Sequence, residues 1–109
     1  MYANMILTNN KIEMKVDLDK QFKGMDGKPV VTMPTIRMGL AQALYNGNGI
    51  GNTQEEKFAA YRLCNRLLNE QGAIELDKDE RNILLAAACA TLTPGGFGQI
   101  KDMFNTKNE

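Results

Sequence analysis

A chain of 109 residues with 43% hydrophobic and 24% charged residues has the size and composition of one globular domain rather than of a disordered segment. Thirteen Lys and Arg balance thirteen Asp and Glu, so no net field attracts a polyanion or an acidic membrane surface. The charge balance therefore disfavours strong, sequence-independent nucleic-acid binding and leaves only the possibility of a small local basic patch.

The N-terminal third predicts a β-hairpin. Residues 11–18 alternate apolar and charged side chains with a period of two, which is typical of a strand with one buried face. Asp26 and Gly27 supply the positive φ of a tight turn, and residues 30–33 have the composition of the returning strand. We therefore expect a hairpin over residues 5–33.

Apolar residues at helical spacing, separated by clusters of glycine, asparagine and proline, predict four helices and a polar tail in the rest of the chain. These segments are residues 35–45, 53–71, 78–92 and 96–104 for the helices and 105–109 for the tail. The fold class that follows is α+β: one domain with an N-terminal β-hairpin followed by three to four α-helices, mainly helical.

The first three helices each begin at a residue that can cap them. Thr35 can accept a hydrogen bond from the first turn of its helix. Thr53 and Glu56 have the spacing of a capping box, and Asp77 and Glu80 repeat it. In the helix that starts at Thr53, an apolar stripe is expected to face the core: Ala60, Leu63, Cys64, Leu67 and Leu68, extended by Tyr61.

Residues 83–90 are eight consecutive apolar residues, so a helix there has no polar face to present to water. We expect this helix to be covered on every side, by the rest of the chain or by a second molecule. Its alanines allow close helix approach, which makes a homodimer seam possible.

Residues 53–92 also have the order helix, turn, helix of DNA-binding proteins, but residues 83–90 offer no side chain that could read base edges.

Cys64 and Cys89 both fall in predicted helices among apolar neighbours, so we expect two small buried thiols and no disulfide. The N-terminus has no basic segment followed by an apolar run, and no stretch approaches the roughly 18 apolar residues that span a bilayer. We therefore expect a cytoplasmic protein without a membrane partner.

No catalytic constellation is visible. The chain has no His, the commonest general base, and two separated Cys cannot form a four-ligand zinc set. Four carboxylates cluster near one helix start: Glu75, Asp77, Asp79 and Glu80. Because Lys78 and Arg81 lie among them, a solvated helix start is the main interpretation and a weak divalent-cation site the alternative. We therefore expect a protein that is not an enzyme and that holds no cofactor and no resident metal.

Two glycine clusters invite an anion-binding interpretation, since glycines before a helix let backbone amides reach a phosphate. Residues 46–52 are chain-breaking Gly and Asn residues apart from Ile50, so they predict a mobile loop. An anion site there is the alternative, which is disfavoured because Glu55 and Glu56 in the following turn would repel a phosphate. Residues 95–98 predict a turn with Phe97 in the core, with an anion cradle as the alternative.

The order of these signatures resembles small proteins of unknown function encoded by tailed bacteriophages and prophages. The matching positions are Gly24, Asp26, Gly27 and Pro29; Leu40, Ala43 and Leu44; Glu56 and Lys57; Ile74, Glu75 and Leu76; and Pro94, Gly98 and Gln99. The resemblance covers residues 12–104 and implies a phage or prophage accessory protein in the bacterial cytoplasm. The chain also resembles tail assembly chaperones, which are small, largely helical proteins that bind another phage protein transiently.

These observations predict a non-enzymatic adaptor or assembly factor that binds a phage or host protein through apolar surface on the last two helices. The candidate interface residues are Ile83, Leu84, Leu85, Phe97, Ile100, Met103 and Phe104. The alternative is a small nucleic-acid-binding regulator that uses lysines around the hairpin. Those candidate contacts are Lys11, Lys15, Lys20, Lys23 and Lys28.

Overall fold

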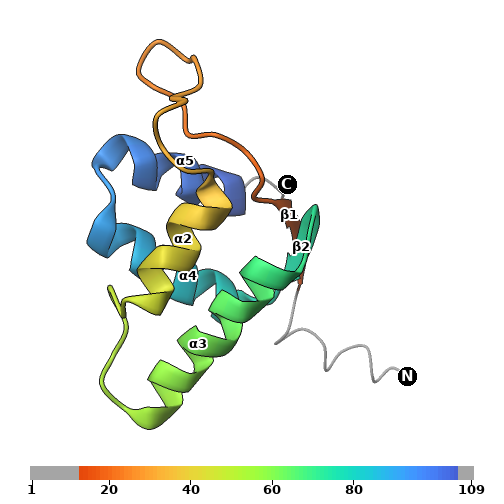
Figure 1. Cartoon of the computed structure of the whole chain (residues 1–109), viewed down its shortest axis with the longest axis vertical. Coiled ribbons are helices and arrows are strands. Elements are labelled where there is room, and N and C mark those ends of the chain that lie inside the picture. Colours follow the sequence, from red (N-terminus) through yellow and green to blue (C-terminus); the bar gives the residue numbers. More distant parts are fainter. Residues whose placement is uncertain (1–12, 106–109) are drawn as a thin grey trace.

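The computed structural model describes residues 13–105, and within that range it contains two strands and four helices. In chain order they are β1 (Met14–Asp17), α2 (Ile36–Tyr45), α3 (Gln54–Asn69), β2 (Ala73–Leu76), α4 (Lys78–Thr91) and α5 (Pro94–Asn105), as Figure 1 shows. The predicted fold class, α+β and mainly helical, is confirmed. The four helices lie close to their predicted bounds.

The strand pairing differs from the prediction. β1 pairs antiparallel with β2, with Val16 opposite Ile74 and Met14 opposite Leu76, and not with residues 30–33. The predicted hairpin over residues 5–33 is therefore wrong, because the strand partner of β1 is β2. Residues 5–12 of that prediction lie outside the described range. The alternation in β1 is confirmed, and β2 shows the same alternation, which buries Ile74 and Leu76 on the face of Val16.

The predicted turn between the two expected strands does form. Gly27 has φ +80° and donates its amide to Gly24 O over 2.9 Å, while Asp26 Oδ1 accepts the amide of Lys28 over 2.9 Å. This turn is the tip of a long loop, residues 18–35, which projects from the helices (Figure 1).

The return of this loop is not a strand. One ladder-type bond, from the Val30 amide to Phe22 O over 2.8 Å, is followed by a turn in which the Met33 amide donates to Val30 O. Pro29 and Pro34 flank this segment and have no N–H to donate, so a continuous ladder cannot form there. Only isolated bridges join the two arms of the loop in the described structure.

Local capping rules account for the helix starts. Thr35 accepts the amide of Met38, and both predicted capping boxes are present, at the starts of α3 and α4. α5 begins at Pro94, two residues earlier than predicted, because Thr93 O accepts the amide of Phe97 over 2.9 Å. Gly95 and Gly96 therefore lie in the first helical turn and do not break the chain.

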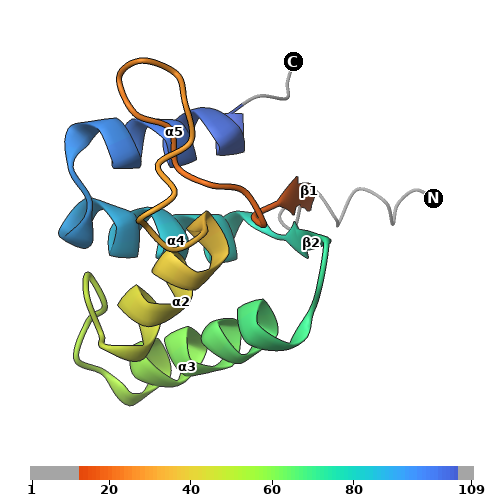
Figure 2. The ribbon, with the colours of Figure 1, turned by 45° about the horizontal axis from the view of Figure 1, so that its top comes forward.

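The helices form a stack in which α4 lies between α2 and α5, and α3 packs on the far side of α2 (Figure 2). One hydrophobic cluster runs through all the elements. Its largest fully buried side chains are Leu18, Leu40, Leu67, Ile74, Leu76, Leu84, Ile100 and Cys64. Each aliphatic member contributes about 1.5–3 kcal/mol by burial, so this core stabilises the arrangement of the helices.

The apolar helix α4 is not covered on every side, which corrects the expectation from its sequence. Leu84, Ala87 and Ala88 are buried. The side chains that face outward are small: Ala86, Cys89 and Ala90. Exposing one methyl group to water costs about as much free energy as exposing one CH₂ group, about 0.8 kcal/mol, so an alanine face can remain exposed. The prediction that Cys89 is buried is wrong for the same reason, whereas Cys64 is buried as expected.

The glycine-asparagine loop between α2 and α3, predicted to be mobile, is packed against α4. Gly49 has φ +75°, and a Cβ built on it would lie 2.3 Å from Ala86 O. Ile50 packs against the core, and its amide donates to Gly47 O over 3.1 Å. The loop is therefore part of the cover of α4, and only a glycine fits at position 49 without displacement.

Candidate protein-binding surface

The structure does not place the predicted interface residues on a common exposed face. Leu84, Ile100 and Phe104 are buried in the core. The others are partly buried and pack against it: Ile83, Leu85, Phe97 and Met103. The reason is that α5 packs along α4, so the apolar stripes of the two helices cover each other. The expectation of an exposed apolar surface made by these residues is wrong.

The alternative lysine set is exposed in the part of the chain described. Exposed members are Lys15, Lys20, Lys23 and Lys28, whereas Lys11 lies outside the described residues. Lys15 stands opposite Glu75 in the sheet register. Glu13 shares a hydrogen bond with Glu75 that raises the pKa of the Glu13 carboxyl. Lys15 therefore has carboxylates beside it, whereas the other three lysines lie on the projecting loop, and nucleic-acid binding by this set stays a prediction.

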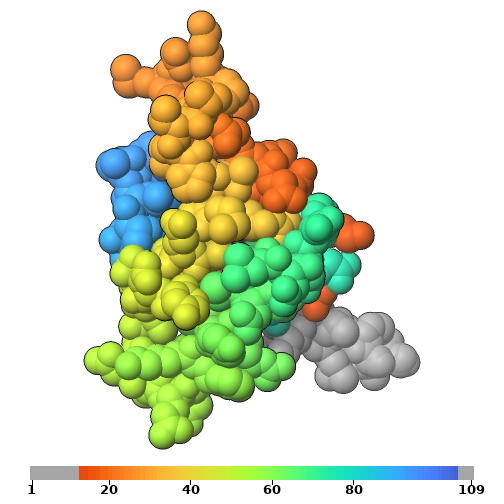
Figure 3. Space-filling model, in the orientation of Figure 1, coloured from red at the N-terminus to blue at the C-terminus, as the bar shows by residue number. Residues whose placement is uncertain are grey.

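A different apolar surface is exposed on α2 and α3. Its members, with their exposed fractions, are Met38 (39%), Tyr45 (75%), Phe58 (57%), Tyr61 (51%) and Leu68 (50%). We refer to these five side chains as the α2–α3 face. Figure 3 shows the yellow atoms of α2 and the green atoms of α3 adjoining on the side of the molecule turned to the viewer.

Helical spacing explains how this face forms. Met38 and Tyr45 are seven residues apart on α2, as are Tyr61 and Leu68 on α3, so each pair spans two turns of one helix side. The two helices pack against each other. Phe58 stacks on Tyr61 with 6.2 Å between ring centroids. The five side chains therefore form two apolar rows on neighbouring helices.

Two hollows lie between these rows. The larger, about 620 Å³, is lined by Leu44, Tyr45, Lys57, Ala60 and Tyr61 together with residues 46, 47 and 50–52. The smaller, about 260 Å³, is lined by Met38, Ala41, Gln42, Tyr45, Asn46, Cys64 and Leu68. Tyr45 and Asn46 line both hollows, so the two adjoin at the C-terminal end of α2, and we refer to them together as the depression.

The floor of the depression is made of small buried residues. Cys64 donates its thiol to Ala41 O over 3.3 Å, which joins α3 to α2 at this point. Burial raises the pKa of the Cys64 thiol, so the sulfur stays protonated at neutral pH and acts as a packing group. Ala41 and Ala60 are also buried, so the floor is narrow and apolar.

Two cations border the α2–α3 face. Lys57 lines the larger hollow, and the Arg62 guanidinium lies over the Phe58 ring at 5.6 Å from its centroid. Unlike Arg37 and Arg66, neither forms an ion pair among residues 13–105. Lys57 therefore places one positive charge at the larger hollow, and Arg62 places another beside Phe58, which lines neither hollow.

Arg37 fixes α2 to the end of α3 from inside the molecule. Its Nη1 donates to Leu67 O over 2.9 Å and its Nη2 to Gly72 O over 2.6 Å. Its Nε pairs with Asp19 Oδ1 over 2.6 Å. This hydrogen bond lowers the pKa of the Asp19 carboxyl. The buried arginine thus provides donors for one carbonyl in the last turn of α3 and for one in the turn between α3 and β2.

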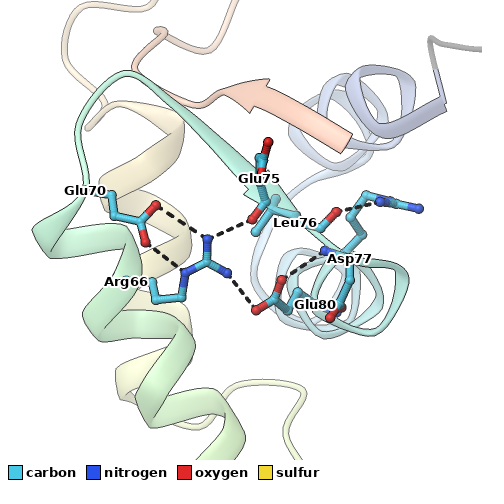
Figure 4. A network of polar contacts seen from close by, with 7 residues as sticks. Arg66, Glu70, Glu75, Leu76, Asp77 and Glu80 are labelled. Carbon is cyan, nitrogen blue, oxygen red and sulfur yellow. Dashed lines mark hydrogen bonds and ion pairs between the residues drawn. The ribbon is translucent and has the colours of Figure 1, made fainter. Parts of the chain in front are cut away.

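Arg66 fixes α3 to β2 and α4 through the network in Figure 4. Its Nη1 pairs with Glu80 Oε2 over 2.7 Å, its Nη2 donates to Glu75 O over 2.7 Å, and its Nε pairs with Glu70 Oε2 over 2.9 Å. The Glu80 carboxylate also accepts the amide of Asp77 as part of the capping box. Arg66 lowers the pKa of Glu70, and these carboxylates raise the pKa of Arg66.

Two carboxylates of the cluster at the start of α4, those of Asp77 and Glu80, thus serve the capping box, and Glu80 also serves the Arg66 network. Within residues 13–105, no group of three His, Cys, Asp or Glu side chains is placed to hold a metal ion. In that same range, no helix is both long and apolar enough to cross a membrane.

The fold and this surface define a small α+β domain with an exposed apolar depression between two helices. No family model, no curated protein and no solved structure matches the chain. The resemblance to phage-encoded proteins therefore stays a prediction.

Sequence reasoning missed the α2–α3 face because it assigned Tyr61 and Leu68 to the core stripe of α3. The signal was present in the width of that stripe. An apolar arc that holds Phe58 and Tyr61 as well as the buried Leu63 and Leu67 is wider than one helix neighbour can cover. An excess of large apolar residues on such a helix indicates a second, outward face.

Proposed function

We propose that this protein is a non-enzymatic binding module that recognises a protein partner through the α2–α3 face. This proposal keeps the adaptor hypothesis and moves its surface from the last two helices to α2 and α3. The observation that carries it is the exposure of five large apolar side chains on two neighbouring helices, four of which line the depression.

The size of the face supports a functional role. A fully buried aromatic side chain covers about 150–250 Å², so the exposed parts of the three rings amount to about 350 Å². With Leu68 and Met38 the face reaches roughly 500 Å², within the roughly 300–600 Å² of the largest apolar patch on a typical monomer, which is often functional. Tyrosines are also enriched at interface cores.

The chemistry of the depression favours binding over catalysis. Its lining is mostly apolar side chains and amides, with the hydroxyls of Tyr45 and Tyr61, the protonated thiol of Cys64, and Lys57 as the charged member among the residues that line the two hollows. The carboxylates whose pKa values are lowered, Asp19 and Glu70, are held by arginines outside it. A general acid or base beside a reacting group is the feature that a catalytic interpretation would need.

The biological setting is part of the same proposal. The resemblance to phage and prophage proteins supports a partner encoded by the phage or by its bacterial host. Genome neighbourhood tests this part: tail genes beside the coding sequence favour an assembly role, early genes favour a host-directed role, and non-viral neighbours contradict the phage origin.

The surface itself is tested by a double variant, Tyr45→Ser with Tyr61→Ser, compared with a matched control on the projecting loop. The control is Met25→Ser with Val31→Ser, which removes two exposed apolar side chains away from the α2–α3 face. The loop variant should keep the stability of the parent to within about 0.5 kcal/mol per substitution, since Met25 and Val31 are well exposed. The Tyr variant loses about 25 cal/mol for each Å² of ring area that is buried, so circular dichroism is used to verify that it remains folded.

The measurement is quantitative capture of proteins from the source cells on the immobilised chain. We expect the Tyr variant to lose the proteins that the parent captures and the loop variant to keep them. If both variants capture the same proteins as the parent, the α2–α3 face is not the binding surface and the proposal fails.

A further inference from the structure

We infer that Asn48 is a site of covalent modification, at which the side-chain amide is lost by deamidation to give aspartate and isoaspartate. Asn48 lies in the glycine-asparagine loop, which Figure 2 shows between α2 and α3. The reaction needs only solvent water, so this site is separate from the proposed function and from any partner of the α2–α3 face.

Deamidation is fastest where Asn is followed by Gly, because a residue without a side chain leaves its own nitrogen free to approach the preceding side chain. The Gly nitrogen attacks Cγ of the Asn and gives its proton to water. The Cγ–Nδ2 bond breaks, and ammonia leaves with a proton taken from water. Water then opens the resulting five-membered succinimide: addition at Cγ gives aspartate, and addition at the main-chain carbonyl gives isoaspartate.

The sequence holds three pairs that can form such a ring. Two are Asn46-Gly47 and Asn48-Gly49, and the third is Asp26-Gly27, which forms the same succinimide with loss of water. In each pair the attacking group is the glycine amide. An amide that donates to a carbonyl must first give up that hydrogen bond, so the structure decides which of the three pairs reacts.

The projecting loop protects Asp26-Gly27. The Gly27 amide donates to Gly24 O over 2.9 Å, so the attacking nitrogen is engaged. The Asp26 carboxylate is engaged as well, because its Oδ1 accepts the amide of Lys28 over 2.9 Å. Both reacting groups of this pair are therefore held in the turn.

The end of α2 protects Asn46-Gly47. Gly47 has φ +80° and donates its amide to Leu44 O over 3.0 Å, as the left-handed residue that closes a helix. The following amide, that of Asn48, donates to Ala43 O over 3.0 Å and completes the closure. The Gly47 nitrogen can attack Asn46 only after this helix end opens.

Asn48-Gly49 has no such protection. Among residues 13–105, the Gly49 amide has no acceptor, and the Asn48 side chain has no hydrogen-bond partner. The neighbouring amide of Ile50 does donate, to Gly47 O over 3.1 Å. Gly49 is also exposed, so water reaches the reacting nitrogen. The structure thus leaves one of the three attacking amides free.

The products disturb the packing of the loop. Isoaspartate lengthens the main chain by one CH₂ group directly before Gly49, where a Cβ would already overlap Ala86 O. The aspartate product places a charge on a half-buried side chain that lines a hollow with Phe22 and Leu92. Residues 50–52 of the same loop line the larger hollow of the depression, so its wall moves with the loop.

The test is incubation of the full chain at mildly alkaline pH, followed by peptide mass spectrometry with fragmentation between residues 46 and 48. In the folded chain we expect Asn48 to lose its amide at least about fivefold faster than Asn46, the factor that one net hydrogen bond provides. In urea the two rates should converge, because both residues precede a glycine and the hydrogen bonds are gone. Isomerisation of Asp26 is followed in the same samples.

Two glutamine variants make the assignment specific. Asn48→Gln should abolish the early loss of amide, because glutamine must close a larger ring, while the matched control Asn46→Gln should leave the rate at Asn48 unchanged. Circular dichroism verifies that both variants are folded, and the rates in the parent chain decide the outcome if one of them is not.

The inference is overturned by equal rates at Asn46 and Asn48 in the folded chain, by faster reaction at Asn46 or Asp26, or by the same ratio of rates in urea. The deamidated chain carries one more negative charge and is separated by ion exchange. We expect it to melt about 4–8 °C lower than the parent, the shift of a single local perturbation in a domain of this size. An unchanged melting temperature would contradict the effect on loop packing.

Discussion

Gly49→Ala should destabilise the fold far more than the same change two residues earlier, at Gly47. Both glycines have positive φ, +75° and +80°, so alanine at either position costs about 1–2 kcal/mol for the left-handed conformation. Alanine also restricts the unfolded chain, which offsets about 0.5–1 kcal/mol of this. At Gly47 a Cβ would have no described atom within 4 Å, so the net cost there is about 1 kcal/mol.

At Gly49 the same methyl group meets the backbone of α4. Its Cβ would lie 2.3 Å from Ala86 O and 2.7 Å from Ala86 C, closer than real Cβ contacts come. The loop must move away by about 1 Å, which also separates Ile50 from the core and loses part of its burial, worth about 1.5–3 kcal/mol when complete. Adding about 2 kcal/mol for this to the backbone strain gives about 3 kcal/mol for Gly49→Ala.

Urea unfolding followed by circular dichroism measures both values, and thermal melting gives a second reading. For a domain of this size, about 4 °C of melting temperature is lost per kcal/mol, so we expect losses of about 12 °C for Gly49→Ala and about 4 °C for Gly47→Ala. Equal losses for the two variants would show that the loop does not pack on α4 in solution, as its glycine-rich composition first indicated.

Three further predictions concern polar contacts. Arg37→Met should lower the free energy of unfolding by about 2–4 kcal/mol in urea titrations, because the carbonyl oxygens of Leu67 and Gly72 lose their donor. The folded-state pKa values of Asp19 and Glu70 are lowered below 3.8 and 4.5, so their contribution to the free energy of unfolding is present above pH 4.5 and is lost as the pH falls through the lowered values. In urea titrations at several pH values, the Asp19→Asn, Glu70→Gln double variant should therefore lose less stability than the parent when the pH is lowered. The Gln99 side chain holds the projecting loop, because it accepts the amide of Lys23 and donates to Lys23 O, both over 2.8 Å. Gln99→Ala should therefore speed hydrogen exchange of the Lys23 amide about fivefold, and unchanged exchange would contradict this role.

The features that sequence predicted well are those decided within a few residues. The capping boxes at Thr53 and Asp77 depend on side chains three positions away, and both formed as predicted. The turn at Gly27 likewise depends on its own φ and on the neighbouring Asp26. Helix bounds followed from these local signals with small errors at the ends.

The features that it missed depend on partners far along the chain. β1 could pair with residues 30–33 or with β2, and alternation alone does not choose between them. The prolines beside residues 30–33 were a local signal against the first choice. Arg37 gives no such signal: its burial depends on carbonyls that α3 presents only after the helices have packed.

The candidate site shows the same division more sharply. Eight apolar residues in α4 suggested a surface that must be covered, yet alanines exposed there cost little. Exposing the large apolar side chains of α3 costs more free energy than exposing alanines. Tyr61 and Leu68 were placed in the core because periodicity shows that a helix has an apolar side but not how much of that side its neighbours cover. Side-chain size, rather than run length, was the better indicator of where a binding surface lies.

The α2–α3 face is also held in place by groups that do not belong to it. Arg66 ties α3 to β2 and α4, and Arg37 ties α2 to the end of α3. Both networks restrict how the two helices can shift relative to each other. A depression whose walls are fixed before binding loses less conformational entropy when a ligand enters. These networks therefore stabilise the fold and also hold α2 and α3, with their apolar rows, in fixed relative positions.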